Sequence, residues 1–139
     1  MTDSFPTYRG AVYPWHCDHM GHMNVMHYAG KFDEATWNLF HHVGLTRARL
    51  AEAGRGMAAV DQHIVYEREL PAGAVIEVSS RLIEVREKLI VFEHVMKDIE
   101  MQAVAARTTL KAVHLDLVQR RACAFDPARA EDMRGHLSR

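Results

Sequence analysis

The spacing of apolar residues changes once along this chain, and that change restricts the fold more than any other feature of the sequence. Between Val25 and Val43, apolar or compact side chains recur every three or four residues, which predicts one long amphipathic helix that ends at Gly44, with Lys31 on a polar face. From Ala58 to Leu117, apolar and polar residues alternate, as they do in half-buried strands. We therefore expect an α+β domain in which the helix packs on one face of an antiparallel sheet.

Turn residues divide the alternating region into strands. We expect five or six strands, one before the long helix and the others after it; the expected ranges are 8–15, 58–69, 76–82, 89–99, 103–117 and a short last strand near 118–124. A short helix is expected at 47–53. Gly30 lies inside the long helix at a cost of about 1 kcal/mol relative to Ala, so we expect the sheet to approach the helix backbone closely there.

The length and composition fit one domain. With 139 residues and 48% hydrophobic content, residues 1–139 can form a single domain, with a core at about 8–126 and a weak, charged tail at 127–139. The formal net charge of -1 does not predict binding to nucleic acid or to membranes. The N-terminus lacks the apolar core of a leader peptide, and no segment approaches the roughly twenty apolar residues of a membrane span. The two Cys are too few for a disulfide framework, so we expect a cytoplasmic protein.

The stretch from Trp15 to Tyr28 concentrates reactive side chains just before the long helix. It holds four imidazoles, a thiol and the carboxyl group of Asp18, for which an ordinary surface loop has no need. Asn24 is a suitable N-cap, so the helix should start at Val25, where free backbone N–H groups can bind a substrate oxygen. Asp18 is therefore the main candidate for a catalytic group, and the alternative is an acid that only hydrogen-bonds the turn.

The histidines of this stretch could instead be metal ligands, since imidazole with carboxylate or thiolate suits zinc. However, the spacing of His16, His19, His22 and His27 fits no defensible ligand pattern, and no distant Cys or His pair completes it. We therefore predict no metal. His22 is expected to orient the loop through a hydrogen bond, whereas the sequence leaves open what His16, His19 and His27 do.

Residues 12–24, followed by Tyr28 and the pair Glu34-Ala35, resemble the signature of the 4-hydroxybenzoyl-CoA thioesterase type of hotdog-fold acyl-CoA thioesterases. In that family a strand leads into a D-x-x-G loop, often continued as G-H-[MV]-N, and then into a helix with an aromatic residue near its start. The resemblance covers about residues 10–125. It implies a hotdog fold, in which a curled antiparallel sheet wraps one long central helix, and hydrolysis of an acyl-CoA thioester to a free acid and CoA.

The resemblance also implies roles for residues of the loop. Asp18 corresponds to the catalytic Asp of the family, which attacks the thioester carbonyl or activates the water that does, and both roles stay open. The backbone N–H of Val25 would stabilise the carbonyl oxygen. Gly21, with His22 and Asn24, would set the loop geometry.

Further implied roles lie outside the loop. Tyr28 and Phe32 would line the acyl pocket, while Arg86 and Lys88 would bind the CoA phosphates. Glu87 stands where relatives can have a third basic residue, and a solvated hairpin tip is the alternative for this segment. No cofactor is implied, because the CoA thioester is the substrate. The family forms homodimers whose sheets join edge to edge, and the sequence leaves open a dimer or a tetramer of two dimers.

Two other functions compete with thioester hydrolysis. A hotdog enoyl-CoA hydratase or dehydratase uses a D-x-x-x-x-H spacing, but the residue five after Asp18 is Met23, and His22 comes one step early. A non-catalytic acyl-CoA-binding protein would keep the fold without the chemistry, which the retained carboxylate argues against. The sequence does not identify the acyl group.

Overall fold

A computed structural model of the chain describes residues 4–137, which form one six-stranded antiparallel sheet and three helices. The strands are β1 (Phe5–Ala11), β2 (Arg55–Tyr66), β3 (Val75–Val85), β4 (Leu89–Asp98), β5 (Ala103–Asp116) and β6 (Arg121–Ala122). The helices are α1 (Val25–His42), α2 (Arg47–Ala53) and α3 (Pro127–Arg134), and a short 3-10 turn, η1 (Pro14–His16), follows β1. The strand order is β1-β3-β4-β5-β2, with β6 paired to β5.

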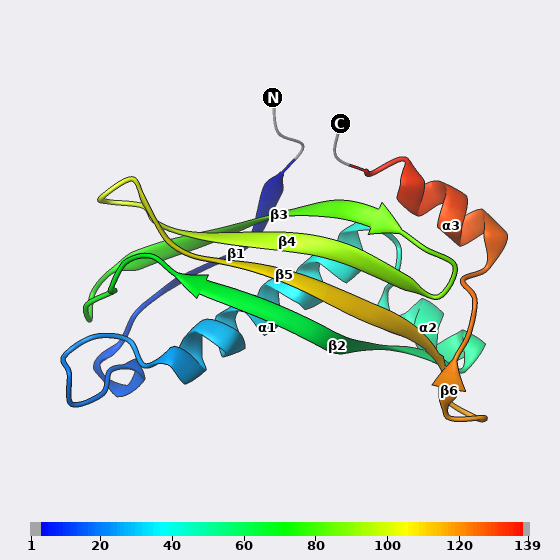
Figure 1. Cartoon of the computed structure of the whole chain (residues 1–139), viewed down its shortest axis with the longest axis horizontal. Helices are drawn as coiled ribbons and strands as arrows, with labels where there is room; N and C mark the ends of the chain where they lie inside the picture. The colour runs from blue at the N-terminus through cyan, green and yellow to red at the C-terminus, as the bar shows by residue number, and fades with distance from the viewer. Residues whose placement is uncertain (1–3, 138–139) are drawn as a thin grey trace.

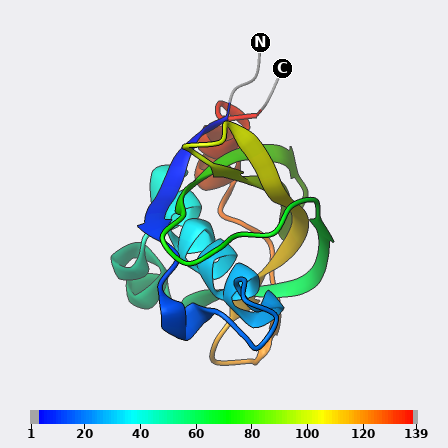
Figure 2. The same cartoon turned by 90° about the vertical axis from the view of Figure 1, so that its left-hand side faces the viewer.

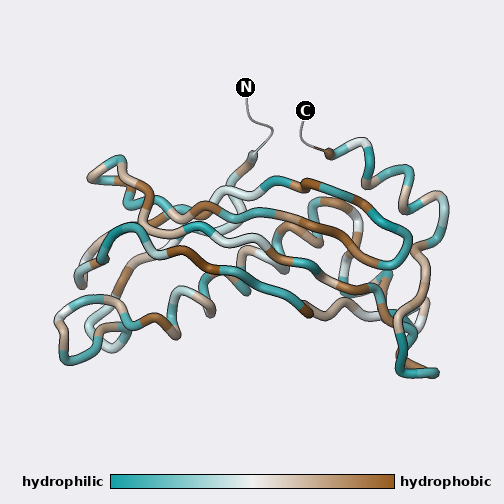
Figure 3. The backbone as a smooth tube through the Cα atoms, viewed as in Figure 1, coloured by the Kyte–Doolittle hydropathy of each residue, from teal (hydrophilic) through white to brown (hydrophobic). Residues whose placement is uncertain are grey.

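The sheet curls around α1, as Figure 1 and Figure 2 show from two sides. Side chains at helical spacing on one side of α1 are buried against the sheet: Tyr28, Phe32, Ala35 and Leu39. On β5, Ala105 and Ala106 are fully buried and leave room for the helix, as the sequence predicts. Hydrophobic and hydrophilic residues alternate along the long strands (Figure 3), because one face of the sheet covers the core and the other faces outward.

Local sequence explains where α1 begins and ends. The side-chain oxygen of Asn24 accepts a hydrogen bond from the backbone N–H of Met26 at 3.1 Å, which confirms the predicted cap and the start at Val25. The helix ends at His42, and Gly44 follows with a φ of 89°, a left-handed conformation that favours glycine. The N-terminus of α1 is thereby fixed directly behind the Asp18 loop.

The expected single helix corresponds to α1, but the described part of the chain has three helices. α2 matches the short helix expected at 47–53. α3 lies in the predicted tail and contributes to the core, because Ala130 and Met133 share one side of it and are buried against Leu82 and its neighbours. Two apolar positions in a charged segment were too weak a pattern to predict this packing. Residues 1–3 of the predicted domain and 138–139 of the predicted tail lie outside the described residues.

Two expectations about α1 were wrong. The sheet does not approach Gly30, since a Cβ built there has no atom of another element within 4 Å. Lys31, which the helical pattern assigns to a polar face, is 5% exposed, and its Nζ lies 3.4 Å from Oη of Tyr8 on β1. The first strand of the sheet covers this side of the helix, and the long Lys side chain reaches past it.

None of the helices in residues 4–137 is long and apolar enough to cross a membrane. The edge strand β2 is exposed over most of its length, and within residues 4–137 it pairs only with β5. Its outer edge is therefore open to another strand.

Candidate active site

The loop between η1 and α1 is held as a tight turn. The backbone N–H of Gly21 donates to the carbonyl of Asp18 at 3.0 Å, and the N–H of Asp18 donates to the carbonyl of His22 at 3.2 Å. Gly21 has a φ of 87°, a left-handed conformation that favours glycine. Met23 is buried, and its N–H donates to the carbonyl of Leu70 at 2.8 Å, so the loop is fastened to the segment between β2 and β3.

The Asp18 carboxylate is held by two hydrogen bonds. Nδ2 of Asn24 donates to Oδ2 at 2.8 Å, and the backbone N–H of Met20 donates to Oδ1 at 2.9 Å. Both donors stabilise the charged form, and they hold the pKa of this carboxyl group below its usual value, the Asn24 bond contributing most. Asp18 is therefore an ionised carboxylate of fixed orientation at neutral pH.

Asn24 links this carboxylate to the helix. Its Oδ1 accepts the capping hydrogen bond from the Met26 N–H, and its Nδ2 donates to the Asp18 carboxylate. The oxygen and the nitrogen of one side-chain amide thus each make a hydrogen bond. The predicted role of Asn24 in loop geometry therefore has a definite contact behind it. Within residues 4–137, no oxygen accepts from the N–H of Val25, the first residue of the helix.

A small pocket of about 260 Å³ opens beside the start of α1, between the helix and the end of β2. It is lined by His22, Met23, Val25, Tyr28, Tyr66, Glu67, Arg68 and Glu69. The hydroxyl of Tyr28 donates to the carbonyl of Arg68 at 3.2 Å, and its ring packs edge-on against Tyr66, with centroids 5.1 Å apart. Burial raises the pKa of Tyr28 to about 12, with further contributions from Tyr66 and Glu69. Tyr28 therefore stays a neutral wall of this pocket.

Phe32, the second residue expected in an acyl pocket, lies elsewhere. It is fully buried in the core and stacks on His94, with ring centroids 5.8 Å apart. Phe32 is one helical turn further along α1 than Tyr28, and at that depth the sheet buries this face of the helix. The structure thus brings Tyr28, but not Phe32, to the pocket wall.

The loop histidines differ in their surroundings. Nε2 of His22 lies 3.4 Å from Oε1 of Glu69 across the pocket, while its backbone carbonyl holds the Asp18 turn. Nδ1 of His16 accepts from the backbone N–H of Tyr13 at 2.9 Å, and its ring lies 4.8 Å from that of His27. Burial, followed by the charges of Lys31 and His27, lowers the pKa of His16. Within residues 4–137, no three His, Cys, Asp or Glu side chains gather as a metal site would require.

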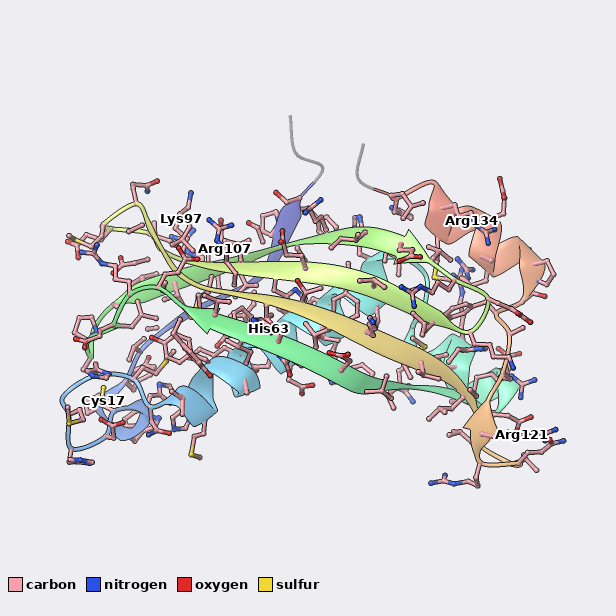
Figure 4. All side chains as sticks on the ribbon, in the orientation of Figure 1. Cys17, His63, Lys97, Arg107, Arg121 and Arg134 are labelled. Carbon is pink, nitrogen blue, oxygen red and sulfur yellow. The ribbon has the colours of Figure 1, made fainter. Side chains whose placement is uncertain are left out.

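Arg86 and Lys88 lie at the other end of the molecule. They occupy the turn between β3 and β4, on the right of Figure 1, whereas the Asp18 loop is on the left, near the labelled Cys17 of Figure 4. The Arg86 guanidinium makes two hydrogen bonds to the Glu84 carboxylate, at 2.9 and 3.1 Å. Within one chain, Arg86 and Lys88 therefore lie far from Asp18. The Arg86 guanidinium is also already paired with the Glu84 carboxylate.

Tyr66 and Glu69 are pocket residues that the sequence analysis did not single out. No local pattern pairs position 66 with position 28, because their contact requires β2 to fold over the start of α1. A Tyr at the end of a strand is itself a common feature, and only the fold shows that it borders the loop.

The sequence of this chain is similar to those of known thioesterases. A family model described as the Thioesterase-like superfamily matches residues 12–133. The chain is 31% identical over 111 residues, 80% of its length, to an L-carnitine dehydrogenase/betainyl-CoA thioesterase of Agrobacterium fabrum. It is 29% identical over 83 residues, 60% of its length, to a betainyl-CoA thioesterase of Pseudomonas aeruginosa. These alignments span 22% and 52% of the two relatives, so the chain covers only part of their length.

Solved structures share the fold. A hypothetical protein of Staphylococcus aureus, solved in complex with CoA, superposes with a TM-score of 0.87 at 17% identity, over 96% of this chain and 84% of that one. A probable thioesterase of Escherichia coli gives a TM-score of 0.80 at 19% identity, over 94% and 97% of the two chains. The curled antiparallel sheet with its helices is thus the fold of hotdog thioesterases.

Proposed function

Since this chain belongs to the Thioesterase-like superfamily, we propose that it hydrolyses an acyl-CoA thioester to a free acid and CoA, with Asp18 as the reacting carboxylate. The observation that carries the proposal is the Asp18 carboxylate itself, which Asn24 and the Met20 N–H keep ionised and oriented directly before α1. CoA thioester is the substrate, and no further cofactor takes part. The 4-hydroxybenzoyl-CoA type remains our prediction for the finer family.

Two routes use the same carboxylate. In one, a carboxylate oxygen bonds to the thioester carbon, the C–S bond breaks, CoA leaves as the thiolate, and water then hydrolyses the acyl-aspartate anhydride. In the other, Asp18 takes a proton from a water molecule while the water oxygen attacks the same carbon; the C–S bond then breaks, and the CoA thiolate leaves and takes up the proton. In both, the N–H of Val25 donates to the carbonyl oxygen as negative charge develops on it. The helix dipole of α1 adds to that stabilisation.

The pocket beside Val25 suits a cationic acyl group. Its lining holds two aromatic rings, Tyr28 and Tyr66, and two carboxylates, Glu67 and Glu69, against one guanidinium, Arg68. Glu67 also pairs with Arg107 at 2.7 Å, which leaves Glu69 as the main acid for a cation. Faces of aromatic rings and acids both attract a quaternary ammonium group. The two curated relatives are named for betainyl-CoA, whose acyl group carries such a cation. Betainyl-CoA is therefore the first substrate to test, with 4-hydroxybenzoyl-CoA second.

The exposed edge of β2 supports a homodimer as the working form. Val60, Val65 and Tyr66 are large apolar residues on this edge strand, each at least 46% exposed. Antiparallel pairing of two β2 strands about a twofold axis sets the Tyr66 end of one copy beside the Arg55 end of the other. The turn between β3 and β4 of the second copy then lies at the same end of the dimer as Asp18 of the first. In that position Arg86 and Lys88 of the second copy would bind the phosphates of CoA. The outer sheet face argues for a dimer over a tetramer, because charged residues line it: Glu77, Arg81, Glu93, Lys97 and Arg107.

The decisive experiment measures thiol release from a panel of acyl-CoA thioesters. Asp18→Asn should lower kcat by roughly 10³-fold, since it removes the attacking or activating group. Asp33→Asn is the matched control, because Asp33 is an exposed acid on α1 away from the loop. Unchanged hydrolysis in Asp18→Asn would exclude the mechanism.

The same panel separates the alternatives. Hydration of crotonyl-CoA without thiol release from any thioester would establish the hydratase. Saturable binding of acyl-CoA without turnover would establish a non-catalytic binding protein. Tyr66→Leu should raise KM for betainyl-CoA about tenfold more than for acetyl-CoA, because only the former places a cation against the ring.

A further inference from the structure

A cavity far from Asp18 lies at the end of the molecule where α2, α3 and the ends of β2 and β5 meet. It measures about 760 Å³ and lies between α2 and α3 on the right of Figure 1, away from the Asp18 loop on the left. Its lining combines three guanidinium groups with two carboxylates, those of Asp126 and Asp132, and with small and apolar side chains. Neither the family resemblance nor the proposed reaction gives this cavity a role.

Two of the guanidinium groups converge on one glycine. A Cβ built on Gly44 would clash with Nη1 of Arg129 on α3 and would lie 3.1 Å from Nη1 of Arg49 on α2. Only the missing side chain at Gly44 makes room for both groups. Two like charges from separate helices therefore lie close together at the cavity wall, and the neighbouring Asp132 carboxylate pairs only with Arg129.

The acids near these arginines leave one guanidinium without a carboxylate. Arg129 pairs with Asp132 at 2.7 Å, and Arg55 lies 3.4 Å from Asp116. Arg49 donates only to a backbone carbonyl, that of Gly44 at 3.3 Å, and no carboxylate in residues 4–137 is within ion-pair distance of it. Arg49 thus keeps most of its hydrogen-bonding capacity for a ligand.

Part of the lining is apolar. Ala53 on α2 and Ala128 on α3 are small residues, and Leu50 adds an apolar wall. The floor contains Phe125, whose ring stacks on His114 with centroids 4.5 Å apart. A cavity of several hundred Å³ with apolar walls and a few convergent polar groups is the usual form of a small-molecule site.

We propose that this cavity is a second binding site, which takes an organic phosphate with a flat body, such as a nucleoside phosphate. Arg49 and Arg129 bind the phosphate above Gly44, and the base lies in the slot, by which we mean the part of the cavity lined by Ala53, Phe125 and Ala128. A phosphate dianion matches several guanidinium groups better than a single carboxylate does. Two sources share this chemistry: the phosphoadenosine end of a CoA thioester, and a free nucleotide.

Calorimetric titration of the full chain with adenosine 3′,5′-bisphosphate tests the proposal. Wild-type protein should bind it, and Arg49→Gln should weaken binding by about tenfold or more through loss of charge-assisted hydrogen bonds. Arg47→Gln is the matched control, because Arg47 lies on α2 but does not line the cavity, and its affinity should not change. Equal losses in both variants, or no binding to wild type, would overturn the proposal.

A second variant guards against a folding defect in Arg49→Gln. Ala128→Trp fills the slot from an exposed position and removes no charge, so it should abolish binding of the bisphosphate. Inorganic phosphate should bind wild type more weakly than the bisphosphate; equal affinity would contradict the role of the flat body. The same titrations should give an unchanged bisphosphate affinity in Asp18→Asn, which separates binding at this cavity from catalysis.

Kinetics then identify the source of the phosphate. If Arg49→Gln raises KM for a CoA thioester in step with the lost bisphosphate affinity, the ligand is the CoA end of the substrate. If KM stays constant while bisphosphate affinity falls, the ligand is a free nucleotide. Either outcome supports the site.

Discussion

Two polar clusters contact α1, and they differ in how their surroundings treat charge. At the N-terminus of the helix, the Asp18 carboxylate is partly exposed and has hydrogen bonds from Asn24 and Met20. Against the middle of the helix, His94 on β4 is fully buried between α1 and the sheet. Both groups have lowered pKa values, but hydrogen bonds favour the charged form of Asp18, whereas burial disfavours the charged form of His94 and lowers its pKa to about 3.

The hydrogen bonds of His94 fit a neutral ring. The Thr36 hydroxyl donates to the Phe32 carbonyl at 3.0 Å, so its oxygen accepts from Nε2–H of His94 at 2.8 Å. Nδ1 of His94 then accepts from the Ser80 hydroxyl at 2.5 Å. The Ser80 Oγ in turn lies 2.6 Å from Oγ1 of Thr7. The Asp18 cluster therefore keeps a charge available for chemistry, whereas the His94 cluster fixes the packing of α1 on the sheet.

The largest effect on stability is expected from His94→Ala. It leaves a cavity between Phe32 and Phe92 and removes the partner of two buried hydroxyl groups, so the free energy of unfolding should fall by about 3 kcal/mol or more. Urea unfolding measures the loss. His63→Ala on β2 is the control, because His63 is exposed and its replacement should lower the free energy of unfolding only slightly. Similar losses in both variants would remove the contrast between the clusters.

Asn24→Asp separates the two functions of Asn24. Asp also caps helices, so stability should change by only about 0.5 kcal/mol, whereas Asn24→Ala should lose about 1 kcal/mol. The new carboxylate lacks the Nδ2 donor and repels Asp18, which raises the pKa of Asp18. We expect kcat to fall about tenfold and the acid limb of the pH–rate profile to move to higher pH. An unshifted profile would show that Asn24 is only a cap.

Stability should depend on pH through His94. Its pKa is about 3 when folded and near 6.5 when unfolded, so between these values the unfolded chain binds more protons than the folded chain. The contribution of His94 to the free energy of unfolding is fully present above pH 6.5 and is lost as pH falls toward 3. The free energy of unfolding should fall by up to about 1.4 kcal/mol per pH unit in this range. Unfolding experiments across this range should show the slope in wild type and its reduction in His94→Phe.

The smallest expected effect is at Gly30. In one chain a Cβ there meets open space, so Gly30→Ala should stabilise the protein by up to about 1 kcal/mol. Thermal unfolding at low protein concentration measures this gain. A loss that grows with protein concentration would instead show that a second copy packs on this side of α1, which would extend the comparison to the assembled form.

Much of the fold and part of the site were predictable, because they depend on neighbouring residues. The start of α1 at Val25, the cap at Asn24 and the bend at Gly21 each follow from one or two adjacent side chains. The separation of Arg86 from Asp18 was not predictable, since a resemblance names residues without saying which copy of the chain supplies them. The buried position of Lys31 was missed because helical periodicity says which face a residue occupies, but not what covers that face.

The sequence by itself determined α1, α2, the long strands, their order and the carboxylate placed before a helix, since periodicity, capping and turn chemistry act over a few residues. Only the tertiary structure decided that Tyr66 borders Tyr28, that Thr36 meets His94, and that Arg49 and Arg129 converge on Gly44. Such contacts join residues far apart in the chain. They depend on the curl and register of the sheet, which the local pattern of residues leaves open and which the packing of the whole core fixes.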